Sequence, residues 1–413
     1  MSAARPRLAV VLSHPTQYYS PWFRRIAALG AIDLRVYYLW DFGVQARHDR
    51  DFGQALQWDI PLMDGYMSEF VPNRSPDPGT HHFSGLDNPG LARRLAQARP
   101  DAILLFGYAY RSQLGVMLSP RLAGVPLMLR GDSHDLARPS GFKSTAGRLA
   151  RRILFRRFAR VLAVGKANAA YFRDNGVPAA HIRFVPHCVD NDRFRAGAGD
   201  ASVRAMALRR ELGIAVHATV VLFAGKFEQK KRPLDLLAAF LRIEREAPAG
   251  SAGAVLLLVG SGVLEEELRR MAGDALGRSV FFCAFQNQSQ MPAVYAAADL
   301  LALASFGNGE TWGLAVNEAM NLARPCLVSS HVGCGPDLVR EGETGWLFKA
   351  GDPDALHAAL ERAFAAGPVG RATMGRLAQA RVEEYSFDVA AAALRDVLAS
   401  LPPTTTADIE GAP

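Results

Sequence analysis

Cysteine is scarce in this sequence. Only four occur in 413 residues, at the widely spaced positions Cys188, Cys283, Cys326 and Cys334. Three of the four lie in apolar surroundings, where cysteine behaves as a small buried hydrophobe. The pattern argues against a disulfide framework or a cysteine-ligated metal site, and it predicts free thiols in a reducing compartment.

Long hydrophobic runs are also missing. No run approaches the roughly 20 residues of a membrane-spanning helix, and the apolar part of residues 1–15 is short for a signal peptide. No internal repeat or long low-complexity tract occurs, and the proline, threonine and charge content of residues 401–413 predicts a disordered tail. These absences lead us to expect a cytoplasmic protein.

The composition is that of an ordinary globular protein, with 49% hydrophobic and 21% charged residues and enough chain for two domains. The formal net charge is +7 and the pI is about 9.4. An excess of positive charge favours an anionic partner, which includes nucleotides, phosphorylated substrates, membrane surfaces and nucleic acids. Charge alone does not choose among them.

Short apolar runs alternate with amphipathic stretches along the whole chain, a pattern typical of βαβ units and parallel sheets. The runs that predict strands are 8–13, 32–39, 101–106, 126–130 and 160–164 in the first half, and 219–225, 254–260, 279–285, 299–305 and 324–330 in the second. The periodicity is broken around residues 185–205. We therefore predict an α/β protein of two doubly wound, Rossmann-like domains facing a central cleft, where the carboxyl ends of the strands bind ligands.

The predicted boundaries follow from this break. Residues 1–195 form an N-terminal domain that binds an acceptor, and residues 196–385 form a C-terminal domain that binds a nucleotide. Residues 386–400 form a helix that packs back on the N-terminal domain.

The stretch FGNGETWGLAVNEAM (306–320) follows a predicted strand and carries two glutamates eight positions apart. Glu310 lies in a glycine-bearing turn, and Glu318 lies about two turns into the following helix. A helix N-terminus exposes unpaired amides and partial positive charge, which suits a phosphate or a sugar hydroxyl. Two carboxylates beside such a site are favourable when they accept hydrogen bonds from sugar hydroxyls; a solvated helix face is the alternative.

A basic loop, GKFEQKKRP (225–233), follows another predicted strand. It places Lys226, Lys230, Lys231 and Arg232 at one strand end. Lysine is a flexible point charge that suits phosphate oxygens, and the electrostatic stabilisation of a departing diphosphate is a large catalytic effect. A solvated lysine-rich loop is the alternative.

Taken together, these segments and the later motifs GCGPD and ETGWLF resemble, in order and spacing, the retaining family 4 glycosyltransferases with the GT-B fold. The resemblance is strong over residues 185–387. It implies that Glu310 contacts the transferred sugar and Glu318 the ribose, and that Lys226 and Lys231 hold the diphosphate, with Gly225 beside them. It further implies that the backbone amides of Thr311, Trp312, Gly313 and Leu314 contact phosphate or sugar. Lys226 stands where the family more often has arginine.

The amino-terminal half is less typical of that family. His14, Gln17 and Tyr18 follow the first strand and are predicted to bind acceptor hydroxyls, although a satisfied histidine and a packed tyrosine are equally expected there. Asp132 and His134 follow another strand, near where the family carries a histidine beside the reacting sugar. Both are candidate catalytic residues, and we slightly favour His134 from its residue type.

Residues 143–161 form an arginine-rich segment whose Leu149, Ile153, Leu154 and Phe158 lie on or near one helical face. Such a helix could meet an anionic bilayer, or it could pack on the domain with its arginines solvated. No aromatic and basic platform or nucleic-acid reader motif accompanies it, so we expect no nucleic-acid partner.

The function predicted first is the transfer of a sugar from a nucleotide sugar to an acceptor hydroxyl with retention. The resemblance implies no required metal or cofactor, and no Asp-x-Asp pair suited to a metal diphosphate lies near the motifs. A UDP sugar is the default donor, with GDP and ADP sugars open. The acceptor is a glycan, a lipid-linked intermediate of envelope or exopolysaccharide synthesis, or a small molecule. A sugar-nucleotide epimerase and a non-catalytic nucleotide-sugar or membrane-binding protein are the alternatives.

Overall fold

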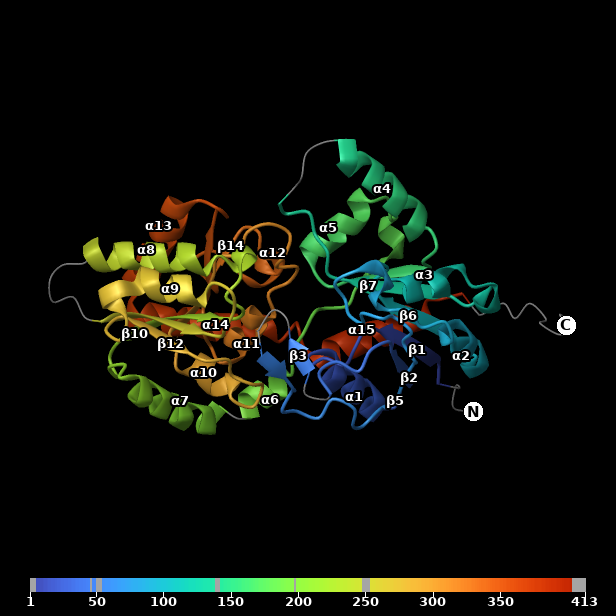
Figure 1. The fold of residues 1–413 in the computed structure, drawn as a ribbon, viewed down its shortest axis with the longest axis horizontal. Helices are drawn as coiled ribbons and strands as arrows, with labels where there is room; N and C mark the ends of the chain where they lie inside the picture. The colour runs from blue at the N-terminus through green and yellow to red at the C-terminus, as the bar shows by residue number, and fades with distance from the viewer. Residues whose placement is uncertain are drawn as a thin grey trace, which may run out of the picture.

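The computed structural model describes residues 5–44, 47–49, 54–137, 142–196, 198–246 and 253–402. Two sheets of parallel strands form the centres of two domains that lie side by side (Figure 1). This is the pair of Rossmann-like domains that the alternating pattern predicted. The predicted tail at 401–413 falls outside the described residues from 403 onward.

The sheet of the N-terminal domain has the order β5-β2-β1-β6-β7-β8-β9. Its strands are β1 (Arg7–Leu12), β2 (Asp33–Tyr38), β5 (Met67–Phe70), β6 (Ala102–Phe106), β7 (Leu127–Gly131), β8 (Arg160–Ala163) and β9 (Ile182–Phe184). A small antiparallel hairpin, β3 (Arg47–Asp49) and β4 (Gln54–Leu56), extends from this domain between β2 and β5.

The sheet of the C-terminal domain has the order β12-β11-β10-β13-β14-β15. Its strands are β10 (Thr219–Ala224), β11 (Ala254–Val259), β12 (Val280–Cys283), β13 (Leu300–Leu303), β14 (Cys326–Ser329) and β15 (Gly345–Phe348). In both sheets the strand order turns back beside the first strand of the domain, β1 or β10. Ligands bind at such switch points in doubly wound sheets.

Helices cover both faces of each sheet (Figure 1). In the N-terminal domain they are α1 (Tyr19–Leu29), α2 (Leu91–Ala98), α3 (Arg111–Leu118), α4 (Phe142–Phe155) and α5 (Lys166–Asp174), with the short turns η1 (Phe83–Gly85), η2 (Pro120–Leu122) and η3 (Ala179–His181). From the linker onward they are α6 (Asn191–Ala196), α7 (Ala198–Leu212), η4 (Gln229–Lys231), α8 (Pro233–Glu246), α9 (Glu265–Ala272), η5 (Gly273–Ala275), α10 (Met291–Ala296), α11 (Leu314–Asn321), α12 (Gly335–Leu338), α13 (Pro353–Ala365), α14 (Gly367–Val382) and α15 (Phe387–Ala399).

The central strands are buried on both faces, which explains why they read as continuous apolar runs. Along β10, Val220 and Leu222 pack into one hydrophobic cluster, whereas Val221 and Phe223 pack into the cluster on the opposite face. The ten predicted strands are confirmed by the structure.

The last helix, α15, returns to the N-terminal domain (Figure 1). Its Ala390, Leu394 and Val397 pack in the same core as Trp22 of α1 and Leu8 of β1. At its first turn Asp388 forms a bidentate ion pair with Arg25 of α1. The chain therefore crosses between the domains twice, once after β9 and once before α15.

Residues 143–161 do not form one continuous helix. Helix α4 ends at Phe155, and strand β8 begins at Arg160. Phe155 and Phe158 are buried in the domain core because the chain turns inward there, while Leu149 and Ile153 stay 62% and 60% exposed. Within the described part of the chain, no helix is long and apolar enough to cross a bilayer.

Candidate functional site

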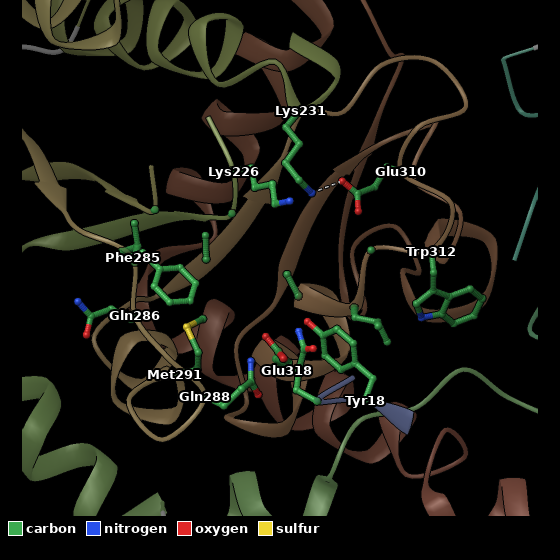
Figure 2. A pocket seen from close by; sticks show the side chains of 18 of the residues that line it. Tyr18, Lys226, Lys231, Phe285, Gln286, Gln288, Met291, Glu310, Trp312 and Glu318 are labelled. Atoms are coloured by element: carbon green, nitrogen blue, oxygen red, sulfur yellow. Dashed lines mark hydrogen bonds and ion pairs between the residues drawn. The ribbon is translucent and has the colours of Figure 1, made fainter. Parts of the chain in front are cut away.

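A cavity of about 450 Å³ lies between the two domains (Figure 2). On the side of the C-terminal domain it is lined by the carboxyl ends of β10 and β11 and by the loop that follows β13. Most of the residues singled out from the sequence line it: His14, Gln17, Tyr18, Asp132, Gly225, Lys226, Lys231, Glu310, Thr311, Trp312, Gly313, Leu314 and Glu318. His134 is not among its lining residues. The fold thus brings together side chains that lie as much as 300 positions apart in the sequence.

Lys231 and Glu310 form an ion pair across the cavity (Figure 2). The Nζ of Lys231 lies 2.5 Å from Oε2 of Glu310, which also accepts a hydrogen bond of 3.1 Å from the Ser305 hydroxyl. Burial alone would raise the pKa of Glu310, but the ammonium of Lys231 and its hydrogen bond lower it below the ordinary value. Glu310 is therefore a carboxylate at neutral pH, and its ion pair fixes the position of the Lys231 ammonium in the cavity.

Glu318 lies on α11 and is buried. Its Oε2 accepts a hydrogen bond of 2.7 Å from the hydroxyl of Tyr295, and the hydroxyl of Tyr18 lies close to the carboxylate. Among the described residues, no partner reaches its buried Oε1. Burial raises the pKa of Glu318 to about 7, so the group is poised between its two forms near neutral pH. Tyr18, predicted on the acceptor side, thus also contacts the carboxylate predicted for the ribose.

Glycine backbones shape the floor of the cavity. Gly313 precedes α11 with φ of 95°, and a Cβ there would lie 2.9 Å from the Val332 side chain. A Cβ on Gly260, at the end of β11, would lie 2.0 Å from the carbonyl oxygen of Gly225. These positions require glycine, and they leave the amides at the start of α11 open to an anion or a hydroxyl.

A strap of hydrogen bonds joins the loop after β7 to the loop that carries Glu310. The Thr311 hydroxyl donates to Oδ2 of Asp132 at 2.7 Å. The side chain of Asn308 exchanges two hydrogen bonds with the backbone of Ala137, at 3.0 and 3.1 Å. The strap fixes the turn of Glu310 from the opposite domain.

His134 takes part in the same strap. Its Nδ1 accepts a hydrogen bond from the amide of Leu136, so its Nε2 carries the proton and donates to the carbonyl oxygen of Glu310 at 3.1 Å. The ring is buried. His134 is therefore hydrogen-bonded to the backbone of Glu310, whereas Asp132 lines the cavity.

Sequence reasoning missed several residues at the site. Tyr295 supports Glu318 from α10, and Arg193 donates two hydrogen bonds of 2.6 Å to Gln288, whose side chain is buried against the cavity. Trp58 and Phe285 line the cavity from opposite domains. Trp58, Phe285 and Gln288 lie on loops, whereas Tyr295 and Arg193 lie on the short helices α10 and α6. No motif marks any of them in the sequence, and only the aromatic type of Trp58 and Phe285 gave a signal.

Groups with the spacing of metal ligands occur away from the cavity in the described chain. Asp77, His81 and His82 gather in the loop before η1, and Glu246, His357 and Glu361 join α8 to α13. In the cavity itself two ion pairs form, Lys231 with Glu310 and Lys230 with Glu228, and their lysines suit direct electrostatic binding of an anion.

Comparison with known proteins gives two family matches. The family described as "Glycosyl transferases group 1" matches residues 218–366, and that described as "Glycosyl transferase 4-like domain" matches residues 69–188. Two curated relatives are D-inositol 3-phosphate glycosyltransferases. That of Corynebacterium jeikeium is 32% identical over 226 residues (54% of this chain and 52% of the relative), and that of Streptomyces avermitilis is 35% identical over 215 residues (51% and 44%). The chain thus spans about half the length of these relatives.

Similar solved structures extend over nearly the whole chain. Anabaena Alr3699/HepE, solved in complex with UDP and glucose, has a TM-score of 0.70 and 20% identity, and the match covers 96% of this chain and 100% of that one. Sucrose-phosphate synthase of Thermosynechococcus elongatus has a TM-score of 0.70 and 19% identity, covering 95% and 98%. At these identities the likeness establishes the fold, the GT-B arrangement of two Rossmann-like domains.

Proposed function

We propose that the chain transfers a sugar from a nucleotide sugar to an acceptor hydroxyl with retention, because its residues 218–366 match the glycosyl transferases group 1 family and its residues 69–188 match the glycosyl transferase 4-like domain. One observation carries the proposal. Lys226 and Lys231, at the end of β10, face Glu310 and Glu318 in a single cavity between the domains. That arrangement provides cations for a diphosphate and carboxylates for sugar hydroxyls on either side of it.

In this proposal the donor lies across the cavity (Figure 2). Its ribose hydroxyls donate to Glu318, and its diphosphate meets Lys226, Lys231 and the amides at the start of α11. The transferred sugar lies beside Glu310. The unpartnered Oε1 of Glu318 supports the ribose assignment, because a buried carboxylate oxygen is costly until a donor reaches it.

The reaction follows from that placement. The bond between the anomeric carbon and the diphosphate oxygen breaks, and Lys226 and Lys231 stabilise the charge that develops on the diphosphate. The acceptor hydroxyl attacks the anomeric carbon from the same face, and its proton passes to the departing diphosphate oxygen. Glu310 stabilises the positive charge on the sugar. His14 and Gln17 hold the acceptor from the N-terminal domain, and Asp132 orients the reacting sugar.

We propose UDP as the nucleotide of the donor by analogy with Alr3699/HepE, whose structure was solved with UDP and glucose. GDP and ADP sugars remain candidates. A thermal-shift comparison of UDP, GDP and ADP ranks them, because a ligand at 100 times its dissociation constant stabilises a protein by about 2.7 kcal/mol.

Two other functions fit the fold. A sugar-nucleotide epimerase needs acids and bases around the sugar ring, and a binding protein needs no catalytic pair. Incubation with candidate sugar nucleotides, with and without an acceptor such as a neutral glycoside, separates them. Release of nucleoside diphosphate with a new glycoside supports transfer, an isomerised sugar nucleotide supports the epimerase, and unchanged donor supports binding alone.

We expect nucleotide binding to be coupled to the ionisation of Glu318. Ribose hydroxyls donate best to a carboxylate, so binding should favour the charged form and release protons at pH 6–7. Calorimetry of the tightest of the three nucleoside diphosphates, in two buffers of different ionisation enthalpy, measures that release. Glu318→Gln should weaken binding and release no protons; equal proton release by the variant would contradict the assignment.

The same group predicts a pH effect on stability. The pKa of Glu318 is about 7 in the folded protein and about 4.5 in the unfolded protein. Its contribution to the free energy of unfolding is therefore fully present below pH 4.5 and is lost as the pH rises through 7. Ligand-free Glu318→Gln should therefore have a higher Tm than the unaltered protein at pH 8, and the difference should shrink at pH 5. A lower Tm for the variant at pH 8 would show that the buried charge is not destabilising.

We also propose that α4 meets an anionic membrane surface, as an enzyme with a lipid-linked acceptor would require. Leu149 and Ile153 are exposed one turn apart, and Arg148, Arg152 and Arg156 are exposed around them. This exposed face is amphipathic and cationic, the combination that binds interfaces. Binding to liposomes tests this proposal.

The protein should sediment with vesicles that contain phosphatidylglycerol, and it should be released as salt rises, because exposed charges are screened over about 8 Å at physiological ionic strength. The double variant Leu149→Asp/Ile153→Asp should stay in the supernatant. Val369→Asp, which changes an apolar residue 79% exposed in the other domain, is the matched control. Equal recovery with neutral and anionic vesicles would exclude this role.

A further inference from the structure

A second set of contacts joins the domains on the side of the cavity opposite the strap. The hairpin of β3 and β4 reaches the junction between the domains (Figure 1), and residues 57–59 follow it directly. The side chain of Asn287 donates to the carbonyl oxygen of Gln57 at 2.7 Å and accepts from the amide of Asp59 at 3.4 Å. The carboxylate of Asp59 accepts from the amide of Ser289 at 3.2 Å and from its hydroxyl. We call this set the clasp.

The clasp places one aromatic side chain at the cavity. Trp58 lies between Gln57 and Asp59, the two clasp residues of the N-terminal domain, and it lines the cavity. Its ring centroid lies 6.4 Å from that of Phe285 in the opposite domain, with the planes tilted by 59°. On its other side Trp58 packs on Gly43, where a Cβ would come within 3.0 Å of the indole. The indole is therefore held at a defined place by both domains.

The residues around Trp58 suit a planar heterocycle. Phe285, Gln286, Gln288 and Met291 gather at one end of the cavity, away from Lys231 and Glu310 (Figure 2). They lie beyond Glu318, on the side where a base attached to its ribose would extend. A nucleobase needs apolar faces above and below its ring and polar groups at its edge, and base stacking on aromatic side chains is largely tolerant of base identity.

We propose that Trp58 of the N-terminal domain covers the base of the bound nucleoside diphosphate, and that the clasp of Asp59 with Asn287 and Ser289 holds it there. This inference rests on the proposed function, since it uses the ribose position at Glu318. It makes the N-terminal domain part of the donor site. Nucleotide binding then favours the arrangement of the domains in which the clasp is formed, because that arrangement supplies the indole.

The test is the affinity of Trp58 variants for the tightest binder among UDP, GDP and ADP. Trp58→Ala removes the stacking surface for the base, so it should bind roughly tenfold more weakly by calorimetry. Trp58→Phe keeps an aromatic face and should bind nearly as well as the unaltered protein. Asp59→Ala should weaken binding in the same direction, and Asp64→Ala, a matched exposed carboxylate outside the clasp, should not.

Fluorescence adds a readout of direct contact. A base stacked on Trp58 should change the tryptophan emission during titration, and Trp58→Phe should lose most of that change while it keeps its affinity. Unaltered affinity in a folded Trp58→Ala protein, or an emission change that Trp58→Phe retains in full, would overturn the inference and leave the proposed function standing. If the unaltered protein binds none of the three nucleoside diphosphates, the proposed function fails and the inference fails with it.

Discussion

Replacing Glu310 by glutamine is expected to lower kcat by about two to three orders of magnitude and to leave the binding of free nucleoside diphosphate intact or stronger. In the ligand-free protein Glu310 accepts a 2.5 Å hydrogen bond from Lys231, which holds its pKa low against burial. The carboxylate is therefore charged when positive charge develops on the sugar. Glutamine keeps the shape and the hydrogen bond of Ser305 but removes that charge.

The binding and kinetic effects of this variant should separate. An interaction made only in the transition state lowers kcat and kcat/KM together, whereas uniform binding mainly changes KM. Without its carboxylate partner, Lys231 is free to meet the diphosphate at no electrostatic cost. Steady-state kinetics and calorimetry of the nucleoside diphosphate measure the two effects. Glu343→Gln, an exposed acid of the same domain, is the control, and full kcat in Glu310→Gln would refute the role assigned to Glu310.

Replacing Lys231 by methionine is expected to affect catalysis and stability together. Loss of the ammonium removes a charge that stabilises the diphosphate, so kcat/KM should fall by about a hundredfold or more and nucleotide affinity should fall with it. It also strands the Glu310 carboxylate, whose side chain is only 12% exposed. Removing one partner of a buried ion pair lowers the free energy of unfolding by about 3 kcal/mol or more at neutral pH.

The pH dependence of that stability loss identifies its cause. In the unaltered protein the pKa of Glu310 is lowered, so the pair contributes stability above the unfolded value of about 4.5 and loses it as pH falls through the folded value. The Tm difference between Lys231→Met and the unaltered protein should therefore narrow on acidification. The double variant Lys231→Met/Glu310→Gln should regain stability at pH 7.5 without regaining activity. A single variant with unchanged Tm and unchanged nucleotide affinity would contradict both roles of the lysine.

The strands could be predicted from sequence because both faces of each sheet are covered by helices. Runs such as 219–225 and 254–260 are continuously apolar for that reason, and they have no period that a helix would impose. The edge strands β5, β9 and β15 were not predicted. Exposed positions such as Phe184 interrupt the apolar pattern of β5 and β9, and β15 has only four residues. The end of α4 was not predicted either. Residues 156–158 resemble α4 in composition, but the chain turns inward there and places Phe158 in the core.

The cavity residues of the C-terminal domain could be predicted from sequence because they lie close to strand ends in a recognisable order. Lys231, Glu310 and Glu318 come from only two segments of one domain. The contacts between domains could not be read from sequence, because they join segments far apart, such as Asp132 with Thr311 and Asp59 with Ser289. A hydrogen bond from a side chain to the backbone of the other domain, such as that from His134 to the carbonyl oxygen of Glu310, leaves no pattern in composition or spacing.

The central claim is that the cavity transfers a sugar with retention from a nucleotide donor. Real-time proton NMR of the protein with UDP-glucose and a panel of neutral glycosides tests it most directly, because the signal of the anomeric proton reports both transfer and configuration. The account predicts release of UDP together with a new glycoside of the same anomeric configuration as the donor, and neither product with Glu310→Gln on the same timescale. A product of inverted configuration, or an isomerised sugar nucleotide with no release of UDP, would contradict it.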